Sequence, residues 1–188
     1  MLAHYPGKGA RTRPTLAESR SRAWLLPLLR PLAPAYARLG LGFQGLEVRS
    51  LPELLSAITA FQEGRSRLIL AFRHAYGDEP QLLSWALDSR LPGLAREAGK
   101  PLKKKPHAAF IHGYEVPLWS GPLVRFLLPR TGALPVHHSR LDQAGLRRIR
   151  EALRDGPHPL ALAPEGQVSY RSRSLPRIEE GAARLGFW

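Results

Sequence analysis

Short apolar runs alternate along this chain with segments whose apolar residues recur at helical spacing. Each run has the length of a buried strand, and each helical segment carries its apolar residues on one face. The runs cover residues 46–49, 68–72, 108–111, 132–136 and 160–163, and the helical patterns cover residues 52–62, 81–87, 142–154 and 178–185. Strands that alternate with helices predict an α/β domain with a mostly parallel or mixed sheet flanked by helices.

The beginning of the chain departs from this alternation. Residues 1–22 are polar, basic and rich in Gly, Pro and Ser, which predicts a flexible arm. Residues 23–41 are apolar, but prolines and arginines interrupt them, so they are too short for a membrane span. Trp24 and leucines beside arginines fit either a helix in the bilayer interface or a core helix of the domain. The α/β domain is then expected to cover residues 42–188.

The charge balance indicates an anionic partner. Against 28 Lys and Arg residues the chain has only 15 Asp and Glu, a net charge of +13. Such a surplus is typical of proteins that meet a membrane surface, a nucleic acid or a phosphorylated substrate. No nucleic-acid-binding motif is present, so we expect no nucleic acid and predict a cytoplasmic protein that is peripheral on an anionic membrane. The alternative function is a basic module that binds nucleic acid or anionic membrane without catalysis.

Other features limit the kinds of site. The chain has no cysteine, which excludes disulfides and thiolate metal sites. Four histidines lack the i, i+4 spacing beside a carboxylate that a metal hydrolase uses: His107, His112, His137 and His138. We predict neither a metal nor a cofactor. Residues 91–106 show no strand or helix pattern and are predicted to form a basic loop, whose lysine run 103–105 is either a solvated surface or a phosphate contact.

The segment Arg73–Pro80 lies between a predicted strand and a predicted helix and carries His74, Asp78 and Glu79. A histidine beside a carboxylate is the pair that general-base chemistry uses, because the ring takes the proton and the acid orients the ring. Pro80 suits the first turn of the helix, where its missing N–H costs nothing. The alternative is that Asp78 or Glu79 only caps the helix and that His74 is structural.

A second acidic loop, Pro164-Glu165-Gly166, follows the strand predicted at residues 160–163. Sites in open α/β sheets collect at the carboxyl ends of the strands. Two loops of this kind therefore predict a single site at that edge of the sheet.

These segments together resemble the glycerolipid acyltransferases, which include the glycerol-phosphate and lysophosphatidate acyltransferases. The family's first motif is His, four residues and Asp, and here His74 and four residues lead to Glu79. A second block resembles Gly132 to His138, and a third resembles Pro164 to Val168, where the Pro-Glu-Gly core is intact. The resemblance runs from about residue 43 to 185. The family's fourth motif has no counterpart before Trp188, which predicts either a truncated domain or a divergent short form.

The resemblance implies transfer of a fatty acyl group from acyl-CoA or acyl carrier protein to a hydroxyl of a lysophospholipid, glycerol phosphate or a related acceptor. His74 would be the general base, and either Glu79 or Asp78 would orient it. Glu165 and Gly166 would shape the acceptor pocket. The family's phosphate-binding arginines are not in register here. The residues that take their place in this prediction are His138, Arg140, Arg171 and Arg173.

Overall fold

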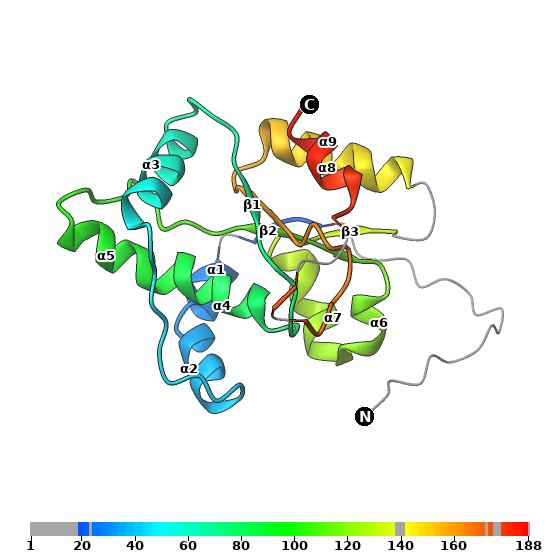
Figure 1. Ribbon diagram of the computed structural model, residues 1–188, viewed down its shortest axis with the longest axis horizontal. Coiled ribbons are helices and arrows are strands. Elements are labelled where there is room, and N and C mark those ends of the chain that lie inside the picture. The colour runs from blue at the N-terminus through cyan, green and yellow to red at the C-terminus, as the bar shows by residue number, and fades with distance from the viewer. Residues whose placement is uncertain (1–18, 23, 138–141, 172, 175–177, 188) are drawn as a thin grey trace.

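The computed structural model describes residues 19–22, 24–137, 142–171, 173–174 and 178–187. Within them four parallel strands form one sheet in the order β1–β4–β2–β3 (Figure 1). β4 lies between its neighbours, since Leu160 is paired with Ile69 on one side and with Ala109 on the other. The strands are β1 Ile69–Ala71, β2 Ala109–Gly113, β3 Leu134–Val136 and β4 Leu160–Leu162. The predicted α/β fold with a parallel sheet flanked by helices is confirmed.

Each face of the sheet has its own core, because successive residues of a strand point to opposite faces. Ala161 packs with Leu55 and Ile58 of helix α3, Leu51–Gln62. Its neighbours Leu160 and Leu162 pack with residues of the C-terminal half, including Ile149 of α8 and Leu185 of α9. Figure 1 shows α8 and α9 together on one side of the sheet and α4 on the other. Helices α8 and α9 cover Gln143–Asp155 and Glu180–Leu185.

Two short helices precede the sheet: α1 covers Leu25–Leu29 and α2 covers Leu32–Leu39. Leu25, Leu26 and Ala37 are buried, so one side of this segment belongs to the domain. The end of the predicted flexible arm is fixed, because the backbone N–H groups of Arg20 and Arg22 donate to the carbonyls of residues 129 and 130 at 2.8 Å each. Residues 1–18 of that arm lie outside the described residues. None of the helices in the described ranges combines the length and the apolar character needed to cross a bilayer.

One long helical segment follows the central loop. It consists of α4, Glu79–Trp85, a wider π-helical turn, Ala86–Arg90, and α5, Leu91–Glu97. The prediction of a loop over residues 91–106 is wrong for its first seven residues. Pro92 is tolerated because it lies in the first turn of α5, and burial of Leu91 and Ala95 stabilises the helix.

Two further connections contain helices. Between β2 and β3 lie α6, Val116–Trp119, and α7, Gly121–Arg130. The helix predicted from Asp142 is confirmed as α8, which this residue caps by accepting a 2.9 Å hydrogen bond from the N–H of Gly145. Although burial alone would raise the pKa of Asp142, hydrogen bonds from the backbone N–H groups of Gly145 and His137 lower it. The strand predicted at residues 46–49 is absent, and this segment is an irregular connection.

Candidate active site

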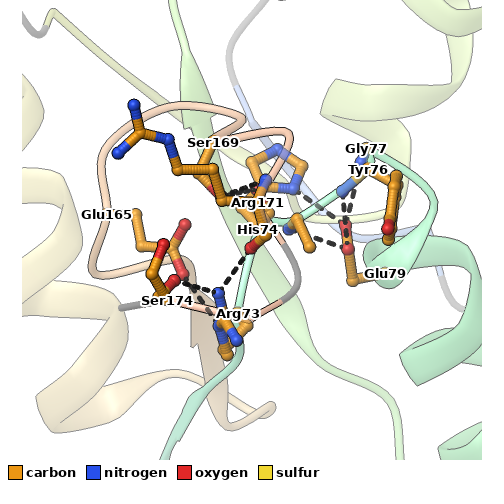
Figure 2. A network of polar contacts seen from close by, with 10 residues as sticks. Arg73, His74, Tyr76, Gly77, Glu79, Glu165, Ser169, Arg171 and Ser174 are labelled. Carbon is orange, nitrogen blue, oxygen red and sulfur yellow. Dashed lines mark hydrogen bonds and ion pairs between the residues drawn. The ribbon is translucent and has the colours of Figure 1, made fainter. Parts of the chain in front are cut away.

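The candidate site begins where β1 ends and a tight loop turns into α4. The N–H groups of Ala75, Tyr76 and Gly77 all point at one side chain, the carboxylate of Glu79 (Figure 2). Gly77 has φ +98°, a conformation that a residue with a Cβ adopts only with strain. The loop geometry therefore depends on a glycine at position 77 and on an acceptor at position 79.

The Glu79 carboxylate accepts four hydrogen bonds from this loop. Its Oε1 accepts from the N–H groups of Ala75 at 2.8 Å and Tyr76 at 2.9 Å, and its Oε2 accepts from Gly77 at 3.0 Å. The fourth donor is the ring of His74. Burial alone would raise the pKa of Glu79, but hydrogen bonds from the His74 ring and from the backbone outweigh burial and hold this pKa below its usual value. Glu79 is therefore an anion that only accepts.

His74 is held by that anion in one orientation. Its Nδ1 lies 3.0 Å from Oε2 of Glu79, and its ring meets Phe72 edge-on with 5.9 Å between centroids. Because Glu79 only accepts, the proton of the neutral ring belongs on Nδ1, and the lone pair is left on Nε2. Nε2 makes no hydrogen bond to the described part of the chain, and 22% of the side chain is exposed. The ring has the arrangement of a general base.

The two acids that the sequence offered as partners of His74 have different places. Glu79 contacts the ring, whereas Asp78 is the residue before α4 and its side chain makes no capping hydrogen bond. Asp78 contributes through its backbone carbonyl, which accepts from the N–H groups of Gln81 and Leu82. The family spacing, with four residues after the histidine, therefore identifies the acid in contact with His74.

The second acidic loop meets the first through Arg73 (Figure 2). Nε of Arg73 lies 3.5 Å from Oε1 of Glu165, a side chain that is almost fully buried. The guanidinium also donates to the backbone carbonyls of Arg171 at 2.7 Å and Ser174 at 2.8 Å. The other carboxylate oxygen of Glu165, Oε2, is buried without a hydrogen-bond partner among the described residues. An unmatched acceptor of this kind is a position for a hydroxyl or N–H donor.

The loop that begins at Pro164 also supports His74 directly. The N–H of Ser169 donates to the carbonyl oxygen of His74 at 2.8 Å, so the two loops share one backbone contact. Gly166 makes the turn possible with φ +71°, and its N–H donates to the carbonyl of Ala163 at 3.2 Å. The structure thus brings His74, Glu79, Glu165 and Gly166 to one edge of the sheet, as the sequence predicts.

The predicted phosphate-binding residues are less closely associated with His74 than the two acidic loops are. Arg171 lies in the loop beside His74, but in Figure 2 its guanidinium points away from the His74 ring. Arg173 lies next to Ser174 and is exposed. His138 and Arg140 lie outside the described residues.

Sequence reasoning missed Arg73, which connects the two acidic loops. The only signal was its position between the strand and His74, because its partner Glu165 is 92 residues away in the chain. It also missed the aromatic pair at the ends of β2 and β3, where Tyr114 and His137 stack with 4.2 Å between ring centroids. Both positions follow strand ends, where side chains gather at the same sheet edge.

The described residues contain no group of three or more His, Cys, Asp or Glu side chains placed to hold a metal ion. The site offers an oriented histidine with an open nitrogen and an anion behind it, and the neighbouring loop holds a buried carboxylate oxygen that Arg73 fixes. Comparison of the chain with protein-family models, with curated proteins and with solved structures finds no match.

Proposed function

We propose that this protein is an acyltransferase that moves a fatty acyl group from an acyl thioester to a hydroxyl of a glycerolipid-type acceptor. The observation that carries the proposal is the open Nε2 of His74 on a ring whose Nδ1 is fixed by Glu79 at 3.0 Å. The motif resemblance supplies the substrate class, with acyl-CoA or acyl carrier protein as donor. Lysophospholipid, glycerol phosphate or a related alcohol would be the acceptor.

The reaction needs one proton to move twice. Nε2 of His74 takes the proton of the acceptor hydroxyl while its oxygen attacks the thioester carbonyl. The Glu79 carboxylate stabilises the imidazolium that forms and remains ionised. When the tetrahedral intermediate collapses, the C–S bond breaks and the leaving thiolate takes the proton back from Nε2. The products are the acyl ester and a free thiol, and His74 returns to its initial state.

Glu165 would position the acceptor. Its buried Oε2 has no hydrogen-bond partner in the described ranges, and Arg73 fixes the carboxylate through Oε1. A glycerol backbone has a further hydroxyl or ester-linked carbon close to the reacting one, and a hydroxyl there can donate to Oε2. Because Arg73 already contacts Glu165 and two backbone carbonyls, it serves to fix the carboxylate. Phosphate recognition would come from Arg171, Arg173, His138 or Arg140.

A lipid acceptor implies a membrane surface, and α1 and α2 would provide it. Trp24, just before α1, is 61% exposed, and Leu32 and Leu39 of α2 are 57% and 90% exposed, although other residues of both helices are buried. An apolar face beside arginines is typical of helices that lie in the bilayer interface.

Leu28→Glu with Leu32→Glu should weaken binding of the full-length protein to anionic vesicles, and high salt should do the same. Unchanged binding by this variant would contradict the role of α1–α2.

The acyl-transfer proposal is tested by the thiol that it releases. Because the chain has no cysteine, a thiol-detecting reagent reads only the released donor thiol. Purified protein would be incubated with acyl-CoA or acyl carrier protein, with and without a panel of lysophospholipids and glycerol phosphate. We expect thiol release that depends on an acceptor, together with an acylated acceptor found by mass spectrometry.

Two results would contradict the proposal. Thiol release that proceeds equally without acceptor would identify a thioester hydrolase, with water in place of the alcohol. Binding to anionic vesicles with no thiol release from any donor would favour the non-catalytic membrane-binding module.

A further inference from the structure

Helix α7 is apolar, yet none of its residues is buried. Leu123 and Phe126 are 67% and 48% exposed, and Trp119 at the end of α6 is 72% exposed. Of the thirteen large apolar side chains that are exposed in the described ranges, nine lie in residues 24–39 and 118–126. Two segments far apart in the sequence thus hold most of the exposed apolar surface.

The same two segments are free of carboxylates. No Asp or Glu occurs between residues 19 and 46 or between residues 116 and 141, although the chain has 15 in all, and these stretches contain seven arginines. Arg130 lies over the ring of Phe126 with 3.8 Å from its guanidinium carbon to the ring centroid. Apolar side chains interleaved with arginine and without acids complement an anionic lipid surface, since the arginines reach the headgroups while the apolar groups enter the acyl region.

The two segments are joined in space. The backbone bonds from Arg20 and Arg22 to the carbonyls of residues 129 and 130 hold the chain that leads into α1 against the end of α7. Helix α2 packs against α4, whose first residue is Glu79. Helix α6 begins three residues after β2 ends, at the same sheet edge as His74, because parallel strands end at one edge. Helix α6 therefore lies at the edge that carries the candidate site, and α2 lies along the helix that begins there.

We propose that α6 and the first half of α7 form a second lipid-contacting surface, which enters an anionic bilayer together with α1–α2 and holds the carboxyl edge of the sheet against the membrane. The site then opens toward the lipid, so a lipid acceptor reaches His74 without crossing water. The proposal extends the membrane association proposed above to a named surface and does not depend on acyl transfer.

The test uses full-length protein and vesicles of phosphatidylcholine with and without phosphatidylglycerol. Leu123→Glu with Phe126→Glu should lower the partition coefficient onto the anionic vesicles about 100-fold, since each apolar side chain withheld from lipid is worth about tenfold or more. Both residues are exposed, so the melting temperature should stay the same. The matched control is Ile178→Glu with Phe187→Glu. It adds the same charge at two exposed apolar residues next to α9, on the opposite side of the sheet in Figure 1, and should bind about as well as wild type.

Further measurements separate this proposal from its alternatives. Quenching of tryptophan fluorescence by brominated lipid should fall in Trp119→Phe, because this side chain would lie in the acyl region. His74→Ala should bind vesicles like wild type, so loss of transfer and loss of binding are separable. Equal weakening by the control variant, or unchanged binding by the α7 variant, would overturn the proposal. A lower molecular mass of the α7 variant in solution would overturn it too, because the face would then be covered by a second copy of the chain.

Discussion

Two histidine–carboxylate pairs lie at opposite edges of the sheet, and they differ in what their second ring nitrogen does. His74 follows β1 at the carboxyl edge, where its Nδ1 meets Glu79 at 3.0 Å. His107 precedes β2 at the amino edge, where its Nδ1 lies 3.4 Å from Asp88. Nε2 of His107 bonds to the carbonyl of Thr131 at 2.9 Å, whereas Nε2 of His74 has no partner among the described residues.

The two pairs also differ in burial, and the pair with the open nitrogen is the more exposed one. The side chains of His107 and Asp88 are 7% and 9% exposed, against 22% and 21% for His74 and Glu79. A ring with both nitrogens bonded in the interior stabilises the fold, and a ring with one open nitrogen at a surface can exchange a proton with a substrate. The pairing of a histidine with an acid is therefore common to both sites, and the open nitrogen is what distinguishes the proposed active site.

The largest effect should come from His74→Ala. Loss of a positioned general base should lower acceptor-dependent thiol release ~10²–10⁴-fold, with little change in melting temperature because the ring is partly exposed. The matched variant, His107→Ala, should keep its turnover per folded molecule and lose about 1–3 kcal/mol of unfolding free energy from its orphaned partners. Turnover and melting of the same preparations measure both. The comparison fails if His74→Ala retains full activity, or if its activity falls only in proportion to the folded fraction.

A smaller but still large effect is expected from Glu79→Gln. The amide cannot hold the Nδ1 proton as the carboxylate does, and its NH₂ group faces backbone donors, so transfer should fall about 10- to 10³-fold. Asp78→Asn, one residue earlier and without contact to the ring, should transfer at the wild-type rate. Initial rates at saturating donor distinguish the two. Loss of transfer in Asp78→Asn with normal transfer in Glu79→Gln would reverse the assignment of the acid.

The smallest effect concerns the amino edge and its dependence on pH. Burial, with an added contribution from His107, lowers the pKa of His158 to about 4, from 6.5 in the unfolded chain. Between pH 6.5 and 4 the unfolded state therefore binds a proton at His158 that the folded state does not bind. The free energy of unfolding that this residue contributes above pH 6.5 is lost as the pH falls toward 4. The loss should be about 2–3 kcal/mol, allowing for partial exposure. Urea unfolding from pH 7.5 to 4.5 measures it, and His158→Gln should flatten this dependence. An equal slope in wild type and variant would assign the acid sensitivity to other groups.

The sequence predicts those parts of the fold and site that depend on local chemistry. Asp142 caps α8 as expected, and the spacing from His74 to Glu79 lies within one turn of chain. Contacts between residues far apart in the sequence, such as Arg73 with Glu165, could not be predicted because no nearby residue indicates the partner. Pro92 and Gly93 read as a loop because the burial that stabilises α5 comes from tertiary packing. Residues 116–130 contain Pro117, Gly121 and Pro122 within a run of apolar residues. Because these residue types usually interrupt helices, the sequence did not predict α6 and α7.

The π-helical turn at Ala86–Arg90 sets the rotational phase of the long helix. In a regular α-helix, residues four apart drift around the axis by about 40° per step, so a row of five would wind away from any flat neighbour. The wider turn rotates the chain less per residue and removes part of this drift. Leu83, Leu87, Leu91 and Ala95, each four residues apart, therefore all reach the same core. Glu79 is the first member of this row. The backbone that carries Glu79 is thus continuous with a row of side chains packed in the core. Deleting one residue from the π turn would therefore change which side chains of α5 face the core, without altering any residue of the site.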